Sequence, residues 1–189
     1  MSGKNKFNKY KFIINIFCKL LCILPYKIKI FIYDISMPIP TIFGVGIRYI
    51  LIKSLCKEVG DNVYIGRYVV IKNFKGITIG KNVSIHEFCY LDGLGCIEIK
   101  NDVSIAHNCS IISFEHSYLD NSISIKYNEI IKNNIIINSN VWIGCGCKIL
   151  SGSHICERAI VGAGSVVKGM LYSNKIYAGV PVRIIKELL

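Results

Sequence analysis

Residues 137–167 read INSNVWIGCGCKILSGSHICERAIVGAGSVV, and a large aliphatic residue returns at every sixth position of this stretch. These aliphatic positions are Ile137, Ile143, Ile149, Ile155, Val161 and Val167. Four residues after each of the first five comes a second inward position, filled by Val141, Cys147, Ser153, Ala159 and Ser165. Each six-residue unit therefore offers one large and one smaller residue to an interior.

The same six-residue spacing runs back to Val59, in blocks whose phase slips by two residues. The blocks are Val59, Ile65, Ile71 and Ile77; then Ile79, Ile85, Leu91 and Ile97; then Ile99, Ile105 and Ile111. An amphipathic helix repeats at three and four residues and an ordinary strand at two, so neither explains a period of six. Hexapeptide repeats are typical of a parallel β-helix, in which each hexad forms a short strand and a corner. About five coils, stacked at ~4.8 Å, predict a prism about 24 Å long.

Three motifs, two in the repeat region and one in the segment that follows it, make the chain resemble a known family. They are NVWIG at 140–144, VGAGSVV at 161–167 and AGVPVRIIK at 178–186. With the repeated Ile-Gly-x-x-Val-x-Ile units, they resemble the hexapeptide-repeat acyltransferase superfamily, in the branch of sugar and surface-polysaccharide O-acetyltransferases. The resemblance covers residues 59–186. It implies a left-handed β-helix, a homotrimer with active sites between subunits, and an acyl-CoA donor.

The candidate catalytic residue is His116, which ends the third block where the hexads stop and loop 117–134 begins. A long loop inside a compact repeat is usually functional, and a neutral histidine can take a proton near pH 7. The resemblance gives His116 the role of general base. It also gives the backbone N–H of Cys145 the role of oxyanion donor, with a thiol nucleophile at Cys145 as the alternative.

Three further side chains, those of His86, Glu115 and Tyr118, are predicted to contact the acceptor. The resemblance places His86 where galactoside-type relatives carry an asparagine that helps to hold the acceptor, and an imidazole can also bond to a sugar hydroxyl. The tyrosines and scattered polar groups of the loop suit a sugar surface and equally a solvated loop. The two remaining histidines, His107 and His154, are predicted to be exposed corner residues.

For coenzyme A, the resemblance implies a groove between neighbouring prisms, built from the later coils and the C-terminal tail. The residues predicted to line it are Trp142, Cys145, Ala163, Gly164, Ser165, Lys168, Arg183 and Lys186. Arginine and lysine suit the phosphates by charge and hydrogen-bond geometry, while Trp142 has repeat packing as its alternative role. Relatives commonly read Val-Thr-Lys-Asp where this chain reads VKGM at 167–170. A phosphate contact is therefore expected to be weakened or rerouted through Lys168.

Residues 1–57 lack the hexads and are predicted to form a basic, apolar helical segment before the β-helix domain at 58–189. Of the net charge of +11, residues 1–58 contribute ten Lys or Arg against Asp34 and Glu58, a balance of +8. Two interpretations stay open: a cap on the open end of the β-helix, and an interfacial anchor on anionic lipid. The lysines that suggest an anchor are Lys4, Lys6, Lys9, Lys11, Lys19, Lys27 and Lys29.

Prolines and glycines predict where the helices of the two ends begin. Pro38 and Pro40, with two glycines close behind, indicate a turn around 36–46, followed by one more helix from Ile47 to Cys56. In the tail at 170–189, the residues from Pro181 onward are predicted to form a short amphipathic helix that packs on the last coil.

The sequence contains nine cysteines, an odd number, and several of them are predicted to be small core residues, since Cys89, Cys109 and Cys147 occupy inward positions of the repeat. No CxxC pair occurs, so the sequence favours a reducing compartment, the cytoplasm, and no metal. The histidine spacing of the zinc site in the carbonic-anhydrase-like branch of this fold is absent. No nucleic-acid-reading motif is present either.

The predicted function is acetyl-CoA-dependent O-acetyl transfer to a saccharide hydroxyl, in surface polysaccharide or glycolipid biosynthesis. Two alternatives remain open. One is N-acetylation of an amino sugar or a small xenobiotic acceptor, and the other is a catalytically inactive β-helix that serves as a scaffold. The expected location is cytoplasmic, with peripheral contact between residues 1–57 and the inner face of the membrane.

Overall fold

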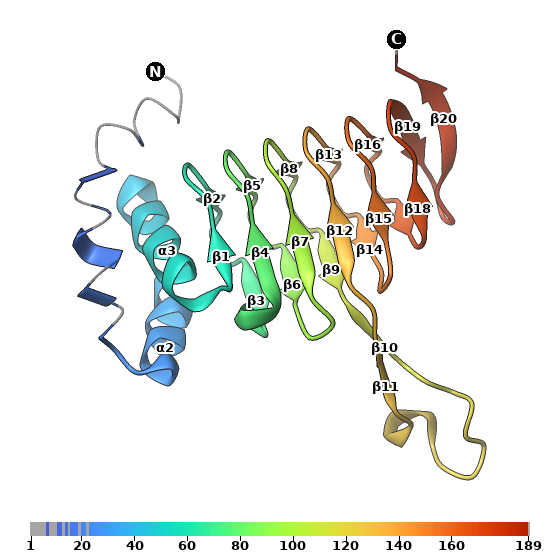
Figure 1. Ribbon diagram of the computed structural model, residues 1–189, viewed down its shortest axis with the longest axis horizontal. Coiled ribbons are helices and arrows are strands. Elements are labelled where there is room, and N and C mark those ends of the chain that lie inside the picture. Colours follow the sequence, from blue (N-terminus) through green and yellow to red (C-terminus); the bar gives the residue numbers. More distant parts are fainter. Residues whose placement is uncertain are drawn as a thin grey trace.

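A computed structural model describes Phe7, Lys11, Phe12, Ile14, residues 16–18, Leu20, Leu21 and residues 23–188. Its body is a left-handed parallel β-helix, a three-sided prism of about six coils with helices at its N-terminal end (Figure 1). The predicted fold class is confirmed for this body, with one coil more than the repeat count suggested.

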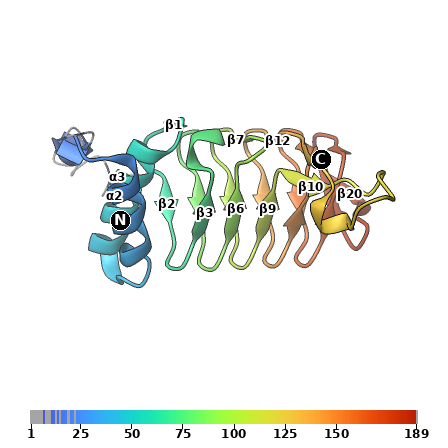
Figure 2. The ribbon, with the colours of Figure 1, turned by 90° about the horizontal axis from the view of Figure 1, so that it is seen from below.

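The three sides of the prism are parallel sheets, here called faces A, B and C. Face A contains β1 (Glu58–Val59), β4 (Ile77–Ile79), β7 (Ile97–Ile99), β12 (Ile135–Ile137), β15 (His154–Ile155) and β18 (Met170–Leu171). Face B contains β2 (Tyr64–Ile65), β5 (Ser84–Ile85), β8 (Ser104–Ile105), β13 (Trp142–Ile143), β16 (Ile160–Val161), β19 (Lys175–Ala178) and β20 (Arg183–Glu187). Face C contains β3 (Val70–Lys72), β6 (Tyr90–Asp92), β9 (Ser110–Ile112), β14 (Lys148–Ile149) and β17 (Val166–Val167). Figure 2 shows the coils stacked in one row between the helices and the C-terminal strands.

The repeat residues fill the prism as predicted. Every large aliphatic residue of the repeat from Val59 to Val167 is buried, and so is each smaller residue four positions later in the last block. The phase slips fall on β4 and β7, where both ends of a three-residue strand point inward. Cys89, Cys109 and Cys147 are buried at their repeat positions, which confirms them as small core residues.

The helical cap, α2 (Tyr26–Ser36) and α3 (Thr41–Leu55), closes the N-terminal end of the prism. In the stack, some N–H groups of each coil donate to the next coil, as Gly66 N does to Ile85 O and Val70 N to Cys89 O, so the equivalent carbonyl groups of Ile65 and Val69 in the first coil have no preceding coil to bond. The cap supplies donors for these two carbonyl groups and for that of Gly60. Tyr33 Oη donates to Val69 O at 2.7 Å, Arg48 Nε to Ile65 O at 3.0 Å, and Tyr49 Oη to Gly60 O at 3.0 Å. These bonds satisfy buried acceptors and cover a sheet edge that would otherwise pair with another chain.

The predicted turn at 36–46 is too long, because α3 already begins at Thr41, directly after Pro40. The proline break is in the right place, but Gly44 lies inside the helix. A Cβ on Gly44 would lie 2.1 Å from Ile39 O, so the glycine permits a close approach there. The candidate anchor lysines Lys4, Lys6, Lys9 and Lys19 lie outside the described residues.

The prediction of a C-terminal helix is wrong. Residues 183–187 form β20, which pairs antiparallel with β19 of the last coil. A bond from Leu188 N to Asn174 O at 2.8 Å and an ion pair between Lys175 and Glu187 extend this pairing. The exposed edge of β19 decides the outcome, since unpaired strand edges favour an added strand over a free helix.

The predicted loop 117–134 is more ordered than expected. β10 (Phe114–His116) and β11 (Ile130–Lys132) pair antiparallel, with the short 3₁₀ helix η2 (Ile125–Tyr127) near the tip. These residues, 114–132, form an arm that projects from the prism (Figure 1). The coils continue undisturbed beneath it, because β12 pairs directly with β7. A second 3₁₀ helix, η1 (Phe74–Gly76), lies in the first coil.

Candidate active site

His116 lies at the base of the arm, at the end of β10. Its backbone is held by pairing with Ile130, and the next N–H, from Ser117, donates to Glu129 O at 2.8 Å. The imidazole is exposed and, within the described part of the chain, no side chain or carbonyl bonds to it. A neutral imidazole on a fixed backbone can accept a proton from an incoming hydroxyl.

Glu115, next to His116, forms an ion pair with Lys168. The Lys168 Nζ and Glu115 Oε2 atoms are 2.7 Å apart, and both side chains remain partly exposed. The structure thus brings together a residue predicted for the acceptor and a residue predicted for a phosphate of coenzyme A. The pair ties the arm to the segment after β17, although exposed pairs stabilise a fold by less than about 1 kcal/mol.

Cys145 lies at the corner between faces B and C, just after β13. Gly144 N donates to Val161 O at 2.7 Å and Gly146 N to His107 O at 3.0 Å, but in the described residues the Cys145 N–H donates to no protein acceptor. It is therefore free to bond an oxyanion. Among the described residues, the corresponding N–H groups of Arg67, His107 and Ala163 also donate to no backbone carbonyl, so this feature alone does not distinguish Cys145.

The neighbouring corner of the next coil carries Ala163 and Gly164, which are both exposed. Gly164 N donates to Cys145 O at 2.8 Å, so the two corners are stacked directly. A Cβ on Gly144 would lie 2.6 Å from Ala163 N, which explains the glycine in this motif. Ser165 is different: its side chain is fully buried and donates to Gly162 O at 2.6 Å. Its hydroxyl therefore belongs to the core of the coil.

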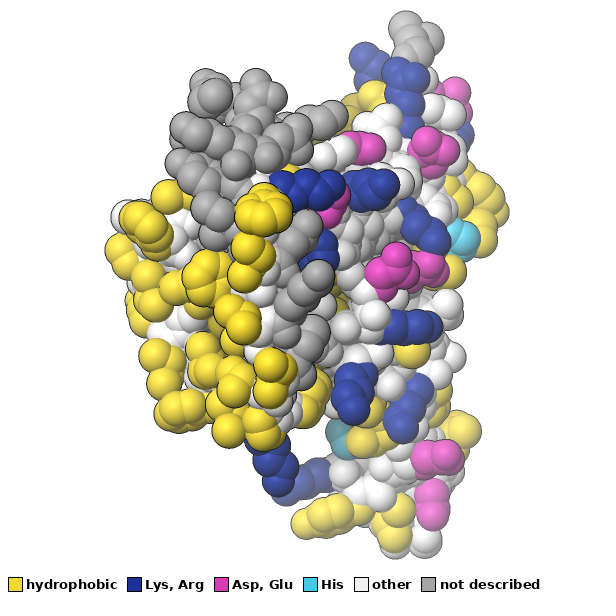
Figure 3. Space-filling model, turned by 60° about the vertical axis from the view of Figure 1, so that its left-hand side comes forward, with side chains coloured by type: hydrophobic (Ala, Val, Ile, Leu, Met, Phe, Trp, Pro, Cys, Tyr) yellow, Lys and Arg dark blue, Asp and Glu magenta, His cyan; other side chains and the backbone are white. Residues whose placement is uncertain are grey.

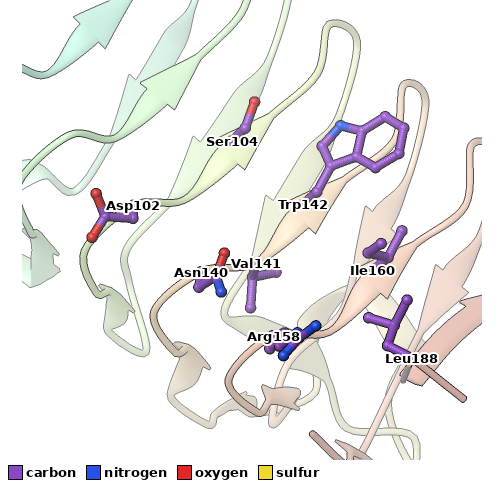
Figure 4. Close-up of a pocket in the computed structure, with 8 residues that line it drawn as sticks. All are labelled: Asp102, Ser104, Asn140, Val141, Trp142, Arg158, Ile160 and Leu188. Atoms are coloured by element: carbon purple, nitrogen blue, oxygen red, sulfur yellow. The ribbon is translucent and has the colours of Figure 1, made fainter. Parts of the chain in front are cut away.

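Trp142 lies on the outer surface of face B and is 54% exposed. It lines an open groove of about 430 Å³ together with Ser104 and Ile160 on the neighbouring strands (Figure 4). Repeat packing therefore does not account for the indole ring, whose face is available to a ligand.

Sequence reasoning missed the remaining residues of this groove, which are Asp102, Asn140, Val141, Arg158 and Leu188. Three of them, Asp102, Asn140 and Arg158, occupy the same corner of successive coils in left-handed backbone conformations. The register could have grouped them, because β8 pairs β13 and β13 pairs β16. Leu188 could not have been found in this way, since it arrives with the tail strand. Arg183 and Lys186 are exposed on that strand.

His86 lies at the corner between faces B and C, two coils before Cys145. Its Nδ1 is 3.8 Å from Glu87 Oε2, and Tyr64 Oη donates to Glu87 Oε1 at 2.8 Å. Partial burial raises the pKa of Glu87, but the bond from Tyr64 and the nearby positive charges lower it overall. An ionised carboxylate therefore lies beside His86.

The other two histidines differ from each other. His107 is exposed at a corner, as predicted. His154 is not, because it lies half-buried in β15 with its Nε2 3.0 Å from Asn138 Nδ2. Tyr118 projects from the arm and is 72% exposed.

One chain does not bring the candidate base and the candidate oxyanion donor together. His116 leaves the prism at the edge between faces C and A, whereas Cys145 lies at the edge between faces B and C.

Among the described residues, no group of three His, Cys, Asp or Glu side chains is arranged to hold a metal ion. In the same part of the chain, no helix combines the length and apolar character needed to cross a bilayer.

Comparison with known proteins gives matches in both sequence and structure. Residues 134–169 match the family described as bacterial transferase hexapeptide (six repeats). Over 146 residues the chain is 30% identical to WbbJ of Escherichia coli, a candidate lipopolysaccharide biosynthesis O-acetyl transferase, covering 76% of this chain and 67% of that protein. The next two curated relatives are matched over only 36% and 27% of their own length.

Solved structures extend this likeness along most of the chain. A galactoside acetyltransferase in complex with coenzyme A is similar at a TM-score of 0.78 and 27% identity, over 87% of this chain and 80% of that one. AntD, an N-acyltransferase from Bacillus cereus, is similar at a TM-score of 0.58 and 29% identity, over 71% of this chain and 84% of that one. The repeat, the fold and the match to a relative over two thirds of that relative's length all point to the same family. The chain therefore belongs to the hexapeptide-repeat acyltransferase superfamily.

Proposed function

We propose that the protein is an acetyl-CoA-dependent O-acetyltransferase that acts on a hydroxyl group of a saccharide, in surface polysaccharide or glycolipid biosynthesis. The observation that carries this proposal is His116, an exposed imidazole on a fixed backbone at the mouth of the only arm among the described residues. The similarity to WbbJ and to a galactoside acetyltransferase supports a saccharide acceptor.

The proposed reaction is direct transfer between two bound substrates. The imidazole of His116 takes the proton of the acceptor hydroxyl while the hydroxyl oxygen attacks the thioester carbonyl carbon. The tetrahedral intermediate then collapses, the C–S bond breaks, and the imidazolium returns the proton to the departing thiolate. The products are an acetyl ester and coenzyme A with a free thiol.

In this proposal the negative charge on the carbonyl oxygen is met by the backbone N–H of Cys145. Since Cys145 and His116 lie at different edges of one prism, the donor and the base come from neighbouring subunits of a homotrimer. Trp142, Ala163 and Gly164 form the wall for coenzyme A. The exposed Arg183 and Lys186 are the proposed phosphate contacts, because Lys168 is already paired with Glu115.

Acceptor contacts are proposed for His86, Glu115 and Tyr118. The carboxylate of Glu87 orients the His86 ring at 3.8 Å, which leaves its far nitrogen for a hydroxyl group. Tyr118 at the start of the arm offers an exposed ring, and aromatic faces suit the apolar faces of sugars.

The donor is tested first, by calorimetry of coenzyme A and acetyl-CoA on the purified protein. Micromolar affinity with one ligand per chain is expected. A screen of hydroxyl- and amino-bearing sugars follows, with thiol release as the readout. A folded protein that binds neither ligand at millimolar concentration would contradict the proposal and favour an inactive scaffold.

A second candidate is acyl transfer to an amino group, which the likeness to AntD favours. The same base and the same oxyanion donor would serve, since only the attacking atom changes. The acceptor screen separates the two activities: turnover of amino sugars without turnover of hydroxyl acceptors would replace the first candidate.

Replacing Cys145 by alanine is expected to leave kcat/KM within about threefold of the parent value, because the proposed donor is the main-chain N–H. The change is small and keeps the corner free of a larger side chain. Steady-state kinetics at saturating acetyl-CoA measure it. A loss as large as that of a His116 variant would show instead that the thiol takes part in the reaction.

The proposed location is the cytoplasm, at the inner face of the membrane. The buried, unbridged thiols of Cys89, Cys109 and Cys147 support a reducing compartment. A lipid-linked glycan at that face would be a suitable acceptor.

A further inference from the structure

The arm is held together by its own hydrogen bonds. Its two strands pair with each other, and Ser117 N donates to Glu129 O at 2.8 Å. Near the tip, the buried side chain of Asn128 accepts a bond from Asp120 N at 3.1 Å. The same amide donates to the carbonyl oxygens of Asp120 and Ser124, at 3.1 and 3.4 Å. The arm therefore keeps its own shape, and what remains to be fixed is its direction relative to the prism.

The root of the arm is bonded to the second coil. Ser113, the residue before β10, donates to Asp92 O through its N–H at 3.2 Å and through its hydroxyl at 2.7 Å. On the return strand, Asn133 N donates to Ser113 O at 3.1 Å. These bonds lie at one residue on each side of the arm, so they fix where the arm begins. A two-stranded hairpin has little stability of its own, so its direction depends on further contacts.

Glu115 provides the further attachment. Its ion pair with Lys168, at 2.7 Å, is the only hydrogen bond or ion pair in the described part of the chain that joins the arm itself to the prism. The register of face C places Lys168 in the same column as Ile112 and Leu150 of the two preceding coils. Lys168 therefore lies on the edge where the arm leaves, two coils further on, or about 10 Å along the prism.

The direction of the arm decides where the imidazole of His116 lies. Side chains alternate along a strand, so those of Glu115 and His116 project to opposite sides of β10. Because Glu115 is held towards Lys168, His116 faces away from the later coils of its own chain. An ion pair that fixes the arm thus places the imidazole without touching it, and a misplacement of about 1 Å is enough to slow a reaction.

We infer that Lys168 is a positioning residue, whose ion pair with Glu115 sets the direction of the arm and so places His116 for acetyl transfer. The inference rests on the proposed function, in which His116 is the general base. It assigns Lys168 to the arm instead of to a phosphate of coenzyme A. Since the pair uses Oε2 of Glu115, the other carboxylate oxygen is left for the acceptor.

The test compares the full chain with Lys168→Met, with Glu115→Gln and with the charge-swapped variant Lys168→Glu/Glu115→Lys. At saturation with both substrates, kcat is expected to fall about threefold to fivefold in each single variant, an effect in keeping with an exposed ion pair. The charge-swapped variant restores the pair and is expected to recover to within about twofold of the parent kcat. Coenzyme A affinity, measured by calorimetry, should stay within about twofold in all three variants.

The matched control is Lys100→Met. Figure 3 shows Lys and Arg side chains interspersed with Asp and Glu side chains over the coils. One ion pair on the coils joins Lys100 to Glu98, and both of its side chains are partly exposed, like those of the arm pair. Lys100→Met removes the same charge and the same kind of contact but leaves the arm attached, so kcat should equal that of the parent.

Hydrogen exchange of residues 114–132 reports on the attachment without any substrate. Exchange is expected to be faster in both single variants than in the parent and in Lys100→Met, because the arm loses its contact with the later coil. Acetyl transfer by the parent tests the proposed function, whereas the ratio of each variant to the parent tests the inference.

Four results would overturn the inference. The first is a Lys168→Met variant with the parent kcat, and the second is exchange of the arm that both single variants leave unchanged. The third is a charge-swapped variant as slow as the single variants. The fourth is a loss of coenzyme A affinity in Lys168→Met of more than about tenfold, which would make Lys168 a phosphate contact.

Discussion

His116→Ala is expected to lower kcat/KM by about 100- to 10,000-fold, the range that loss of a general base produces. Without the imidazole, no group at the arm base takes the proton as the hydroxyl oxygen attacks. The arm itself should persist, because the backbone of β10 is held by pairing with β11 and not by the His116 ring. Steady-state transfer of acetyl to the best acceptor from the screen measures the effect.

The matched control for this variant is His154→Gln. His154 lies in β15, and its ring nitrogen contacts Asn138, a contact that glutamine can also make. This control is expected to transfer acetyl at the parent rate. Coenzyme A affinity should be unchanged in both variants, so that a loss of rate is a loss of chemistry. If His116→Ala kept more than a tenth of the parent rate, the general base would have to be a different residue.

Arg48→Met is expected to lower the free energy of unfolding by about 3 kcal/mol or more, since a buried acceptor left without its donor costs about 1–3 kcal/mol. The Arg48 side chain is only 1% exposed. Its Nε donates to Ile65 O at 3.0 Å, and its Nη1 donates to Ser36 O at 3.0 Å and Ile39 O at 2.9 Å. Burial lowers the pKa of Arg48, but a guanidinium group stays charged in proteins.

The three acceptors explain why this one residue matters so much. They belong to the first coil, to the end of α2 and to the turn before α3, so a single guanidinium joins both helices to the prism. Methionine keeps much of the volume and removes all three bonds. The cap of this variant is expected to detach before the coils unfold.

Chemical denaturation followed by circular dichroism, at matched protein concentration, measures the loss. Arg67→Met is the control, because Arg67 is exposed at a corner of the first coil and its loss should change stability by less than about 0.5 kcal/mol. Equal stability of the two variants would show that the cap does not depend on these bonds. Protease cleavage confined to the cap in Arg48→Met would support the expected order of unfolding.

The two interpretations of the N-terminal segment do not exclude each other, because the capping bonds use buried side chains and leave others on the same helices exposed. The capping interpretation is supported by the bonds of Tyr33, Arg48 and Tyr49 to the first coil. The membrane interpretation stays a proposal, for which the same helices offer exposed apolar side chains such as Phe31 and Phe43. Sequence could not separate these roles, because both require an apolar helix rich in basic residues.

The candidate site could be predicted in part. His116, Cys145 and Trp142 were singled out because each stands at a recognisable place in the repeat or beside its interruption. The structure leaves His116 and Trp142 exposed and Cys145 half-buried, and the roles of all three stay predictions. Ser165 shows the opposite case: its motif suggested a cofactor contact, but it occupies an inward position of the hexad and its hydroxyl bonds inside the coil.

The sequence by itself determined the β-helix. With a period of six, each hexad can bury its large residue if it forms one strand and one corner of a stacked coil, and the hexads from Val59 to Val167 all repeat this requirement. Only the tertiary structure decided the two ends and the arm. The tail forms strand β20 because the edge of β19 has hydrogen-bonding groups that no other strand pairs. Helix α3 begins earlier than predicted because Gly44 permits a close approach to Ile39. Glu115 and Lys168 lie 53 positions apart in the sequence and meet only because the arm leaves the prism beside a later coil. These outcomes depend on neighbours that are distant in sequence, whereas the repeat depends only on residues six positions apart.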